Sequence, residues 1–403
     1  MNAMNEALDA RMEKRRAQNL FRSLRRVDSP TGPVISLEGC RLRNFSSNDY
    51  LGLACHPALK EAAARAAAKW GAGSGASRLI SGSLGLFHDL EDQLAAFKKT
   101  EAALVFSSGY AAALGTIASL MTSADIIIMD KRVHACLVDA SRLSGATLRV
   151  FPHNDMNELE ARLKWARDPA RTGSSRQQVL VITESVFSMD GDRCPLTEIV
   201  ALKNKFGAWL MVDEAHATGI LGSDGRGLAD GLGLSDQVDI HFGTLGKALG
   251  SSGGFVCGSR VLVNYLVNHA RSLIFSTAPV PAAAAAALAG LEILLKEEGS
   301  RRRNQLFQRV QELLAFHPIC KQEEASAIIP WMVGDEARAM AVAGFMRESG
   351  FFLPAIRYPT VARGAARLRI TLSASHSKED VEALITVLRS PNLPHETSQT
   401  LST

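Results

Sequence analysis

Between residues 100 and 260 the chain alternates short apolar runs with stretches of helical periodicity. The runs are rich in β-branched residues, as is typical of strands buried on both faces of a sheet. The stretch 196–207, closed by a glycine, has the spacing and the end signal of a helix. Repetition of this unit predicts an α/β fold with a mainly parallel sheet and helices on both faces. The expected strands are 102–108, 124–130, 178–185, 208–214 and 239–244.

The pattern changes after an alanine-rich helix expected at 280–299. Strands are expected at 327–333, 351–356 and 366–374, and helices at 335–350 and 377–389. This mixture predicts a second, smaller α+β domain. We therefore expect an N-terminal helix and arm over 1–57, a large α/β domain over 58–290, a small C-terminal α+β domain over 291–390, and a disordered polar tail over 391–403.

Charge and composition exclude several function classes. The net charge of +4 is too small to favour nucleic-acid binding. No apolar stretch is long enough to span a bilayer, and no signal-peptide core is present, so no membrane role is expected. The six cysteines are scattered without a CxxC pair, which favours reduced thiols in a cytoplasmic protein. The basic segment 11–26 has acidic residues nearby and indicates a solvated helix rather than a transit peptide.

Polar side chains collect where the expected strands end. Ligands of doubly wound sheets bind at the carboxyl ends of the strands. Any one polar residue there is more often a turn former or a helix cap, but the concentration along one edge favours a ligand site. These residues are Ser107, Ser108, Asp130, Glu184, Ser185, Asp213, Glu214 and Thr244, followed closely by His134, Ser188, His216 and Lys247.

The segment 106–121 runs from a strand through a Ser-Ser-Gly turn into a helix. The free N–H groups at such a helix start suit an anion. Since the segment lacks G-x-G-x-x-G, a dinucleotide is disfavoured and a single phosphate fits better. A plain helix cap explains the stretch equally well.

Asp213 lies near the end of an apolar strand, with His216 three residues further on. A buried carboxylate needs a cationic or hydrogen-bonding partner. A metal ion is one partner, but no third ligand with suitable spacing follows, so no metal site is expected. A protonated heterocyclic nitrogen is a second partner. A Walker B strand is a third interpretation, and it requires a P-loop.

Lys247 stands among glycines directly after the strand 239–244. The sequence around it fails as a P-loop, because His241 occupies the position of the first glycine and Ala248 follows the lysine. An exposed loop lysine is the plain alternative. A lysine, a buried acid and a phosphate-type helix start at one sheet edge together match pyridoxal 5'-phosphate, which binds a lysine as a Schiff base.

Over about residues 5–390 the chain resembles the α-oxoamine synthases, a family of fold-type I pyridoxal-phosphate transferases. The resemblance implies a large domain with a mainly parallel seven-stranded sheet, a smaller C-terminal α+β domain, and a homodimer with active sites at the subunit interface. It also implies a decarboxylating condensation of an amino acid with an acyl thioester. The motifs that carry it include "NFSSNDYLGL" (44–53), "ESVFSMDGD" (184–192), "VDEAHATGILG" (212–222), "GTLGKALGSSGGFVCGS" (243–259) and "IRYPTVARGAARLRITLSASH" (356–376).

Within the family, "DEAHATG" and "FSTAPVP" favour the branch that joins L-alanine to a pimeloyl thioester. "TLGKALG" and "YPTV" are shared with sister enzymes that use glycine and acetyl-CoA or succinyl-CoA. The chain departs from its relatives at Tyr110 and at 77–80, which leaves the acyl-chain preference open. The acyl carrier, coenzyme A or a carrier protein, stays open too, although the basic N-terminal helix would suit an acidic carrier. A nucleotide-binding module and an aminotransferase remain as alternatives.

The resemblance implies roles for individual residues. Lys247 binds the cofactor covalently and moves the α-proton, and Asp213 pairs with the ring nitrogen. His216 and Ser188 bond the ring's phenolic oxygen, and His134 stacks on the ring. The residues implied to hold the phosphate are Ser108, Gly109, Tyr110 and Thr244, with Ser276 and Thr277 from the partner subunit.

The same resemblance assigns the substrate to Asn48 and Arg369, which would hold its carboxylate. Arg22 would bind the acyl end, with Arg25 and Arg26 as rivals, and Thr360 is a further substrate-binding candidate. The period of two in 366–372 puts Arg367, Arg369 and Thr371 on one polar face, and Arg367 fits an exposed sheet face.

Overall fold

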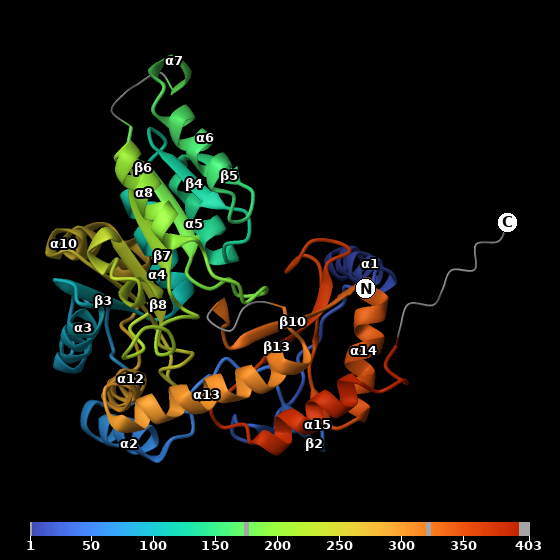
Figure 1. Ribbon diagram of the computed structural model, residues 1–403. Helices are drawn as coiled ribbons and strands as arrows, with labels where there is room; N and C mark the ends of the chain where they lie inside the picture. Colours follow the sequence, from blue (N-terminus) through green and yellow to red (C-terminus); the bar gives the residue numbers. More distant parts are fainter. Residues whose placement is uncertain (1, 173–176, 320–323, 395–403) are drawn as a thin grey trace. The chain divides into compact units, whose positions relative to one another are not determined.

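The computed structural model describes residues 2–172, 177–319 and 324–394 of the chain (Figure 1). It divides into two compact units. The central unit comprises Asn48–Ser188 and Asp192–Gln305, and the terminal unit comprises Met1–Ser47, Met189–Gly191 and Leu306–Thr403. The division expected at residues 57 and 290 stays a prediction, and most of the tail expected to be disordered lies outside the described residues.

The central unit is built on a seven-stranded sheet in the order β3-β9-β8-β7-β6-β4-β5. Strands β4 to β8 pair in parallel, whereas β9 pairs antiparallel with both β3 and β8. The predicted mainly parallel sheet and fold class are thereby confirmed. The strands are β3 (Ala102–Phe106), β4 (Ile126–Asp130), β5 (Thr147–Phe151), β6 (Val179–Glu184), β7 (Trp209–Asp213), β8 (Ile240–Thr244) and β9 (Gly254–Gly258).

Helices connect these strands, with the end signals that the sequence carries. Helix α4 begins after Ser108, whose hydroxyl accepts the Ala111 N–H, and α8 ends at Gly207 with a left-handed φ of 60°. The helices of this unit are α2 (Pro57–Trp70), α3 (Gly85–Lys98), α4 (Gly109–Leu120), α5 (Ala135–Ser144), α6 (Met156–Ala166), α7 (Pro169–Thr172), α8 (Leu196–Phe206), α9 (Leu228–Gly231), α10 (Arg260–His269), α11 (Arg271–Ile274) and α12 (Pro281–Leu294), with a 3₁₀ turn at Ser235–Gln237.

The single helix predicted over 280–299 is wrong in its length. Helix α12 ends at Leu294, and a second helix, α13 (Glu297–Phe316), begins three residues later and runs from the central unit into the terminal unit. A side chain at Gly299 would lie 2.4 Å from the Leu294 carbonyl oxygen. The junction therefore requires a residue without a Cβ at this position.

The terminal unit holds two three-stranded sheets, ordered β1-β2-β11 and β10-β13-β12. The strand predicted over 351–356 is two short strands, one in each sheet. Its strands are β1 (Val34–Leu37), β2 (Cys40–Asn44), β10 (Ile328–Gly334), β11 (Phe351–Phe352), β12 (Ala355–Ile356) and β13 (Ala366–Thr371), and its own helices are α1 (Ala3–Ala17), α14 (Glu336–Glu348) and α15 (Lys378–Leu388).

Arg367 corrects the expectation of an exposed polar face on β13. Every residue of this strand is buried, and Arg367 is only 5% exposed. Its guanidinium lies 2.5 Å from the Asp190 carboxylate, within the terminal unit. Burial of an arginine requires such a partner. Alternation of residue types therefore identified two faces of β13 but not their exposure.

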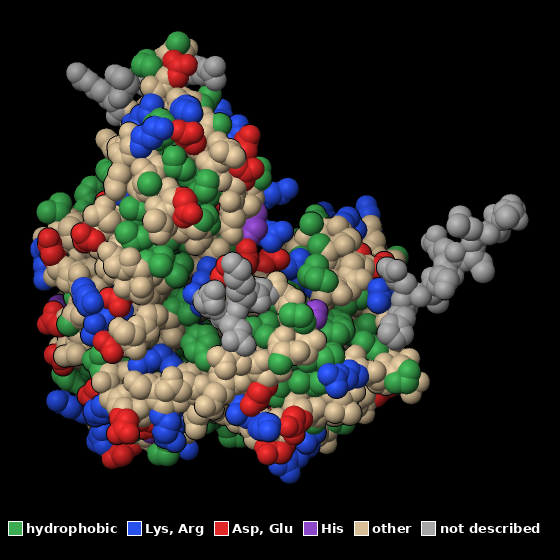
Figure 2. All heavy atoms as spheres, viewed as in Figure 1, with side chains coloured by type: hydrophobic (Ala, Val, Ile, Leu, Met, Phe, Trp, Pro, Cys, Tyr) green, Lys and Arg blue, Asp and Glu red, His purple; other side chains and the backbone are tan. Residues whose placement is uncertain are grey.

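Surface chemistry follows the balanced composition. Figure 2 shows basic and acidic side chains interspersed on the visible face, in keeping with 45 Lys and Arg against 41 Asp and Glu. In the part of the chain that the structure describes, no helix combines the length and apolar character needed to cross a membrane.

Candidate functional site

The acids predicted at the strand ends lie side by side. Strands β6 and β7 are neighbours in the sheet, and Glu184 is paired in register with Asp213. The two residues are 1% and 6% exposed. Parallel strands in register present their last residues at one edge, so the carboxyl edge of the sheet carries two buried carboxylates.

Lys247 follows β8 in a tight turn, in which the Gly250 N–H bonds the Lys247 carbonyl at 2.9 Å. Gly250 has a φ of 66°, and a Cβ there would lie 2.6 Å from the Leu53 backbone. Glycine is therefore needed at this turn. The Lys247 amine lies 2.7 Å from the His216 Nε2 atom, so the predicted lysine and histidine meet.

A chain of hydrogen bonds continues from His216. The Tyr50 hydroxyl lies 2.6 Å from His216 Nδ1 and donates to the Asn48 Oδ1 atom at 3.1 Å. A tyrosine hydroxyl has one proton, so His216 Nδ1–H donates to Tyr50 when Tyr50 donates to Asn48. His216 Nε2 then accepts a hydrogen bond from the Lys247 ammonium. Every hydrogen bond in the series from Lys247 to Asn48 is therefore donated in the same direction. Tyr50, which is fully buried, was missed in the sequence analysis.

Burial sets the electrostatics of Asp213. It raises the pKa of Asp213 to about 6, against the opposing effect of Lys247 and of a bond from the Ala215 N–H at 2.8 Å. A carboxylate with this pKa gains from a further cation beside it. A positively charged group bound near Asp213 would therefore stabilise its ionised carboxylate.

His134 and Ser188 come from different loops, after β4 and after β6. Both of their backbone N–H groups bond the Glu184 carboxylate, Ser188 at 3.2 Å. The His134 ring caps α5, and burial together with the positive charge of Lys247 lowers its pKa. The structure thus brings these two predicted residues to one buried carboxylate.

The start of α4 lies against the first residue of the antiparallel strand β9. A Cβ at Gly254 would lie 2.5 Å from the Ser108 carbonyl oxygen, so only glycine permits this approach. The Thr244 side chain lies 3.8 Å from the Cβ position of Gly109 and bonds the Gly253 carbonyl at 2.9 Å. Three of the residues predicted to hold a phosphate, Ser108, Gly109 and Thr244, therefore lie together. The side chain of the fourth, Tyr110, is 45% exposed.

Ser276 and Thr277 follow α11 in the central unit. Thr277 forms an isolated antiparallel β-bridge with Ser77, and the Ala278 N–H donates to the Ala76 carbonyl at 3.0 Å. Both residues line a cavity of about 10 Å³ with Ser107 of the same chain. Within one chain they lie beside Ser107, and their contribution to the partner's phosphate site stays a prediction.

The remaining candidates are divided between the units. Asn48 belongs to the central unit, whereas Arg22, Thr360 and Arg369 belong to the terminal unit. Arg22 donates to the Thr360 hydroxyl at 3.2 Å, and its rival Arg26 is engaged with Asp28 at 2.6 Å. Arg369 is 8% exposed on β13. Arg22 and Thr360 therefore lie together in the terminal unit, and their assignment to the substrate stays a prediction.

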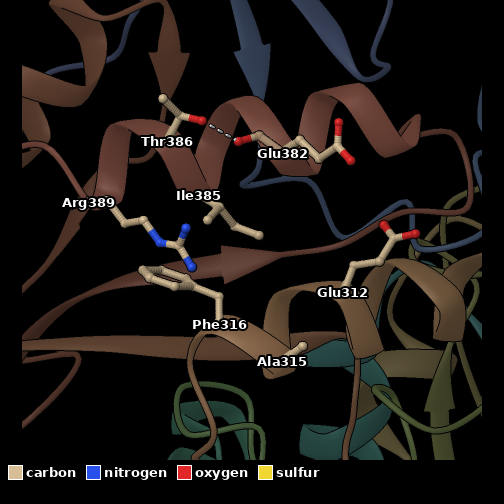
Figure 3. A pocket seen from close by; sticks show the side chains of 7 residues that line it. All are labelled: Glu312, Ala315, Phe316, Glu382, Ile385, Thr386 and Arg389. Atoms are coloured by element: carbon tan, nitrogen blue, oxygen red, sulfur yellow. Dashed lines mark hydrogen bonds between the residues drawn. The ribbon is translucent and has the colours of Figure 1, made fainter.

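A groove of about 330 Å³ between α13 and α15 contains none of the predicted residues (Figure 3). The Arg389 guanidinium stacks there on Phe316, 4.8 Å from the ring centre. The lining residues are Glu312, Ala315, Phe316, Glu382, Ile385, Thr386 and Arg389.

Comparison with known proteins identifies relatives along almost the whole chain. The 8-amino-7-oxononanoate synthases of Anaeromyxobacter dehalogenans and Geobacter sulfurreducens are 46% and 43% identical to it, each over 96% of this chain and 96% and 97% of their own.

Solved structures of related enzymes are also similar to this chain over most of its length. The Sphingomonas wittichii serine palmitoyltransferase is 31% identical, with a TM-score of 0.87 and 96% of each chain covered. The Francisella tularensis 8-amino-7-oxononanoate synthase is 27% identical, with a TM-score of 0.73 over 86% of this chain and 96% of its own. The family model "Aminotransferase class I and II" matches residues 41–388. The chain therefore belongs to the class I and II aminotransferase family of enzymes.

Proposed function

We propose that this enzyme condenses L-alanine with a pimeloyl thioester, with pyridoxal 5'-phosphate as its cofactor. The products are 8-amino-7-oxononanoate, CO2 and a free thiol, and the reaction belongs to biotin biosynthesis. The observation that carries the chemistry is the Lys247 amine beside His216 at a sheet edge with two buried carboxylates. The substrates follow from the relatives named 8-amino-7-oxononanoate synthase.

The residues of the central unit fit this cofactor. Lys247 supplies the amine for covalent attachment, and Asp213, whose buried carboxylate gains from a cation, suits the protonated ring nitrogen. His216 and Ser188 would bond the phenolic oxygen, and His134 would face the ring. The start of α4, with Thr244, would hold the phosphate. When bound, the cofactor supplies an electron sink for the charge that develops at the amino acid's α-carbon.

Proton movement falls to Lys247. Its amine, when it is free of the cofactor, would act as the base for the substrate's α-proton. His216, oriented by Tyr50, accepts a hydrogen bond from the Lys247 amine and so holds it in place. Asn48 and Arg369 would hold the substrate carboxylate, and Arg22 with Thr360 would bind the acyl end.

The assembly is a homodimer in this proposal, with Ser276 and Thr277 reaching the partner's phosphate site. Large apolar side chains near these two residues are exposed in the single subunit, as is typical of a surface that a partner covers. Leu79, Ile80, Phe275 and Val280 are 50%, 78%, 71% and 50% exposed. We place the enzyme in the cytoplasm, which agrees with the five free cysteines of the described residues. An acyl carrier protein is a further candidate donor.

The test is a matrix of amino acids against acyl thioesters, read as CO2 release. L-alanine with pimeloyl-CoA or pimeloyl carrier protein should give the highest kcat/KM. Borohydride reduction and peptide mass spectrometry should find the cofactor on Lys247, and Lys247→Ala should abolish turnover. Lys296→Ala, at a lysine whose side chain is 69% exposed, is the matched control.

The alternatives give other results. Preference for glycine with acetyl-CoA or succinyl-CoA would identify a sister synthase. Amino transfer without CO2 would identify an aminotransferase, and ATP binding without cofactor would identify a nucleotide-binding module. Full turnover by Lys247→Ala would rule out the proposed chemistry.

A further inference from the structure

Glu184 ends β6 with a side chain that is almost completely enclosed, at 1% exposure. One carboxylate oxygen accepts the N–H of His134, and the other accepts the N–H of Ser188 at 3.2 Å. These donors lie 50 residues before and 4 residues after Glu184 in the chain. One side chain therefore joins the loop after β4 to the loop after β6.

The charges around Glu184 belong to the candidate site. Burial raises its pKa well above the usual range, the negative charge of Asp213 acts in the same direction, and Lys247 opposes both. Two N–H donors, one on each oxygen, favour the ionised form. A buried carboxylate beside a second one is costly to maintain, and this cost indicates a role beyond filling space.

Glu91 offers a comparison within the same unit. It is also buried, at 8% exposure, and it accepts a backbone N–H, from Val105 at 3.0 Å. However, its carboxylate is matched by a bidentate bond from Arg78 at 2.8 and 2.9 Å. That arrangement ties α3 to the sheet, whereas Glu184 bonds the backbones of two residues that face the candidate site.

We propose that Glu184 is a positioning residue, which fixes the separation of His134 and Ser188 through its two carboxylate oxygens. The inference rests on the proposed function, in which those two residues contact the cofactor. Glu184 itself need not touch the cofactor. It acts by keeping both loops in place before the cofactor arrives, so that binding does not have to order them.

Substitution should separate this role from simple stability. Glu184→Gln keeps the shape but has one oxygen, so one backbone N–H meets an amide NH2 group instead of an acceptor. Glu184→Asp keeps the charge but is one methylene shorter, so it should retain one of the two bonds. Cofactor affinity should therefore fall in the order wild type, Glu184→Asp, Glu184→Gln.

The experiment titrates cofactor-free full-length protein with pyridoxal 5'-phosphate alone. The Kd for the cofactor should rise about tenfold or more in Glu184→Gln, since one of two buried backbone N–H groups loses its acceptor. At saturating cofactor, the circular dichroism band of the bound cofactor should weaken, because the ring is held less firmly. Glu91→Gln, the matched buried control, should lower the melting temperature without changing either quantity.

The possible outcomes distinguish a failure of the positioning role of Glu184 from a failure of the proposed function. If wild-type protein does not bind the cofactor, the proposed function fails. If wild type binds it and Glu184→Gln has the same Kd and the same dichroism band, only the positioning role fails. Should Glu184→Gln not fold, Glu184→Asp decides: a raised Kd at an unchanged melting temperature supports the role, and a wild-type Kd overturns it.

Discussion

At the scale of single residues, Tyr50 connects the reactive lysine to Asn48 through His216. Tyr50→Phe keeps the ring in its buried position and removes the hydroxyl bond to His216 Nδ1. The imidazole then loses the partner that orients it, and the position of the Lys247 amine becomes less defined. We expect kcat/KM to fall about tenfold, while the melting temperature stays close to that of wild type. Steady-state kinetics at several pH values measure this, and a wild-type kcat/KM would contradict the role of Tyr50.

His153 gives a prediction on pH. Its ring lies 3.0 Å from Asp130 and 2.6 Å from Asp192. Although burial acts in the opposite direction, these carboxylates raise the pKa of His153 to about 9. A histidine with a raised folded-state pKa contributes stability that is fully present below its unfolded pKa and is lost as the pH rises through the folded pKa.

The unfolding free energy should therefore decline between about pH 6.5 and pH 9. The loss should be about 1 kcal/mol, less than the full shift implies, because solvent screens a partly exposed group. Urea unfolding of wild type and His153→Gln across this range measures it. Equal slopes for the two proteins would show that His153 does not carry the effect.

Residues at strand ends were predictable because a parallel sheet brings its carboxyl ends to one edge. Asp213, Glu184 and Lys247 were identified in this way. Tyr50 was not, because its partner His216 lies 166 residues further along the chain and nothing in local spacing links them. The two backbone bonds of Glu184 were hidden for the same reason, although its position at the strand end was apparent.

At the scale of elements, hydrophobic runs predicted the strands that are buried on both faces. Strand β5 was missed because it is an edge strand in which only Phe151 is buried. Strand β9 was missed because its apolar core, "FVC", is only three residues long between glycines. Both strands were missed because an apolar pattern reveals a strand only where enough consecutive residues are buried. It carries no information about which strands pair.

The end of α3 is linked to the loop after β7 by a buried ion pair. The Lys98 amine lies 2.8 Å from the Glu214 carboxylate, and the two side chains are 2% and 1% exposed. Although burial alone would raise it, Lys98 and His241 lower the pKa of Glu214 to about 2. Lys98 also donates to the Thr218 hydroxyl at 2.8 Å, so it holds the loop that contains His216.

Lys98→Met should leave the buried Glu214 charge without its counter-charge and cost about 3–5 kcal/mol of unfolding free energy. The double variant Lys98→Met with Glu214→Gln should recover part of this loss, since no unbalanced charge then remains. Urea unfolding of the two single variants and the double variant provides the cycle. If the single effects simply add, the two residues do not interact energetically.

At the scale of the whole molecule, the proposed dimer predicts complementation between two inactive variants. If each site combines Lys247 of one subunit with Ser276 and Thr277 of the other, a hybrid of Lys247→Ala with Ser276→Ala/Thr277→Ala contains one intact site. Refolding the two variants together in equal amounts makes half of the dimers hybrid, so about a quarter of the wild-type activity should return. Lys247→Ala mixed with Asp213→Ala should behave differently, since those residues share a site within one chain in the proposal, and the hybrid contains no intact site. Activity should therefore appear only in the first mixture, and its absence there would show that each site is built from a single chain.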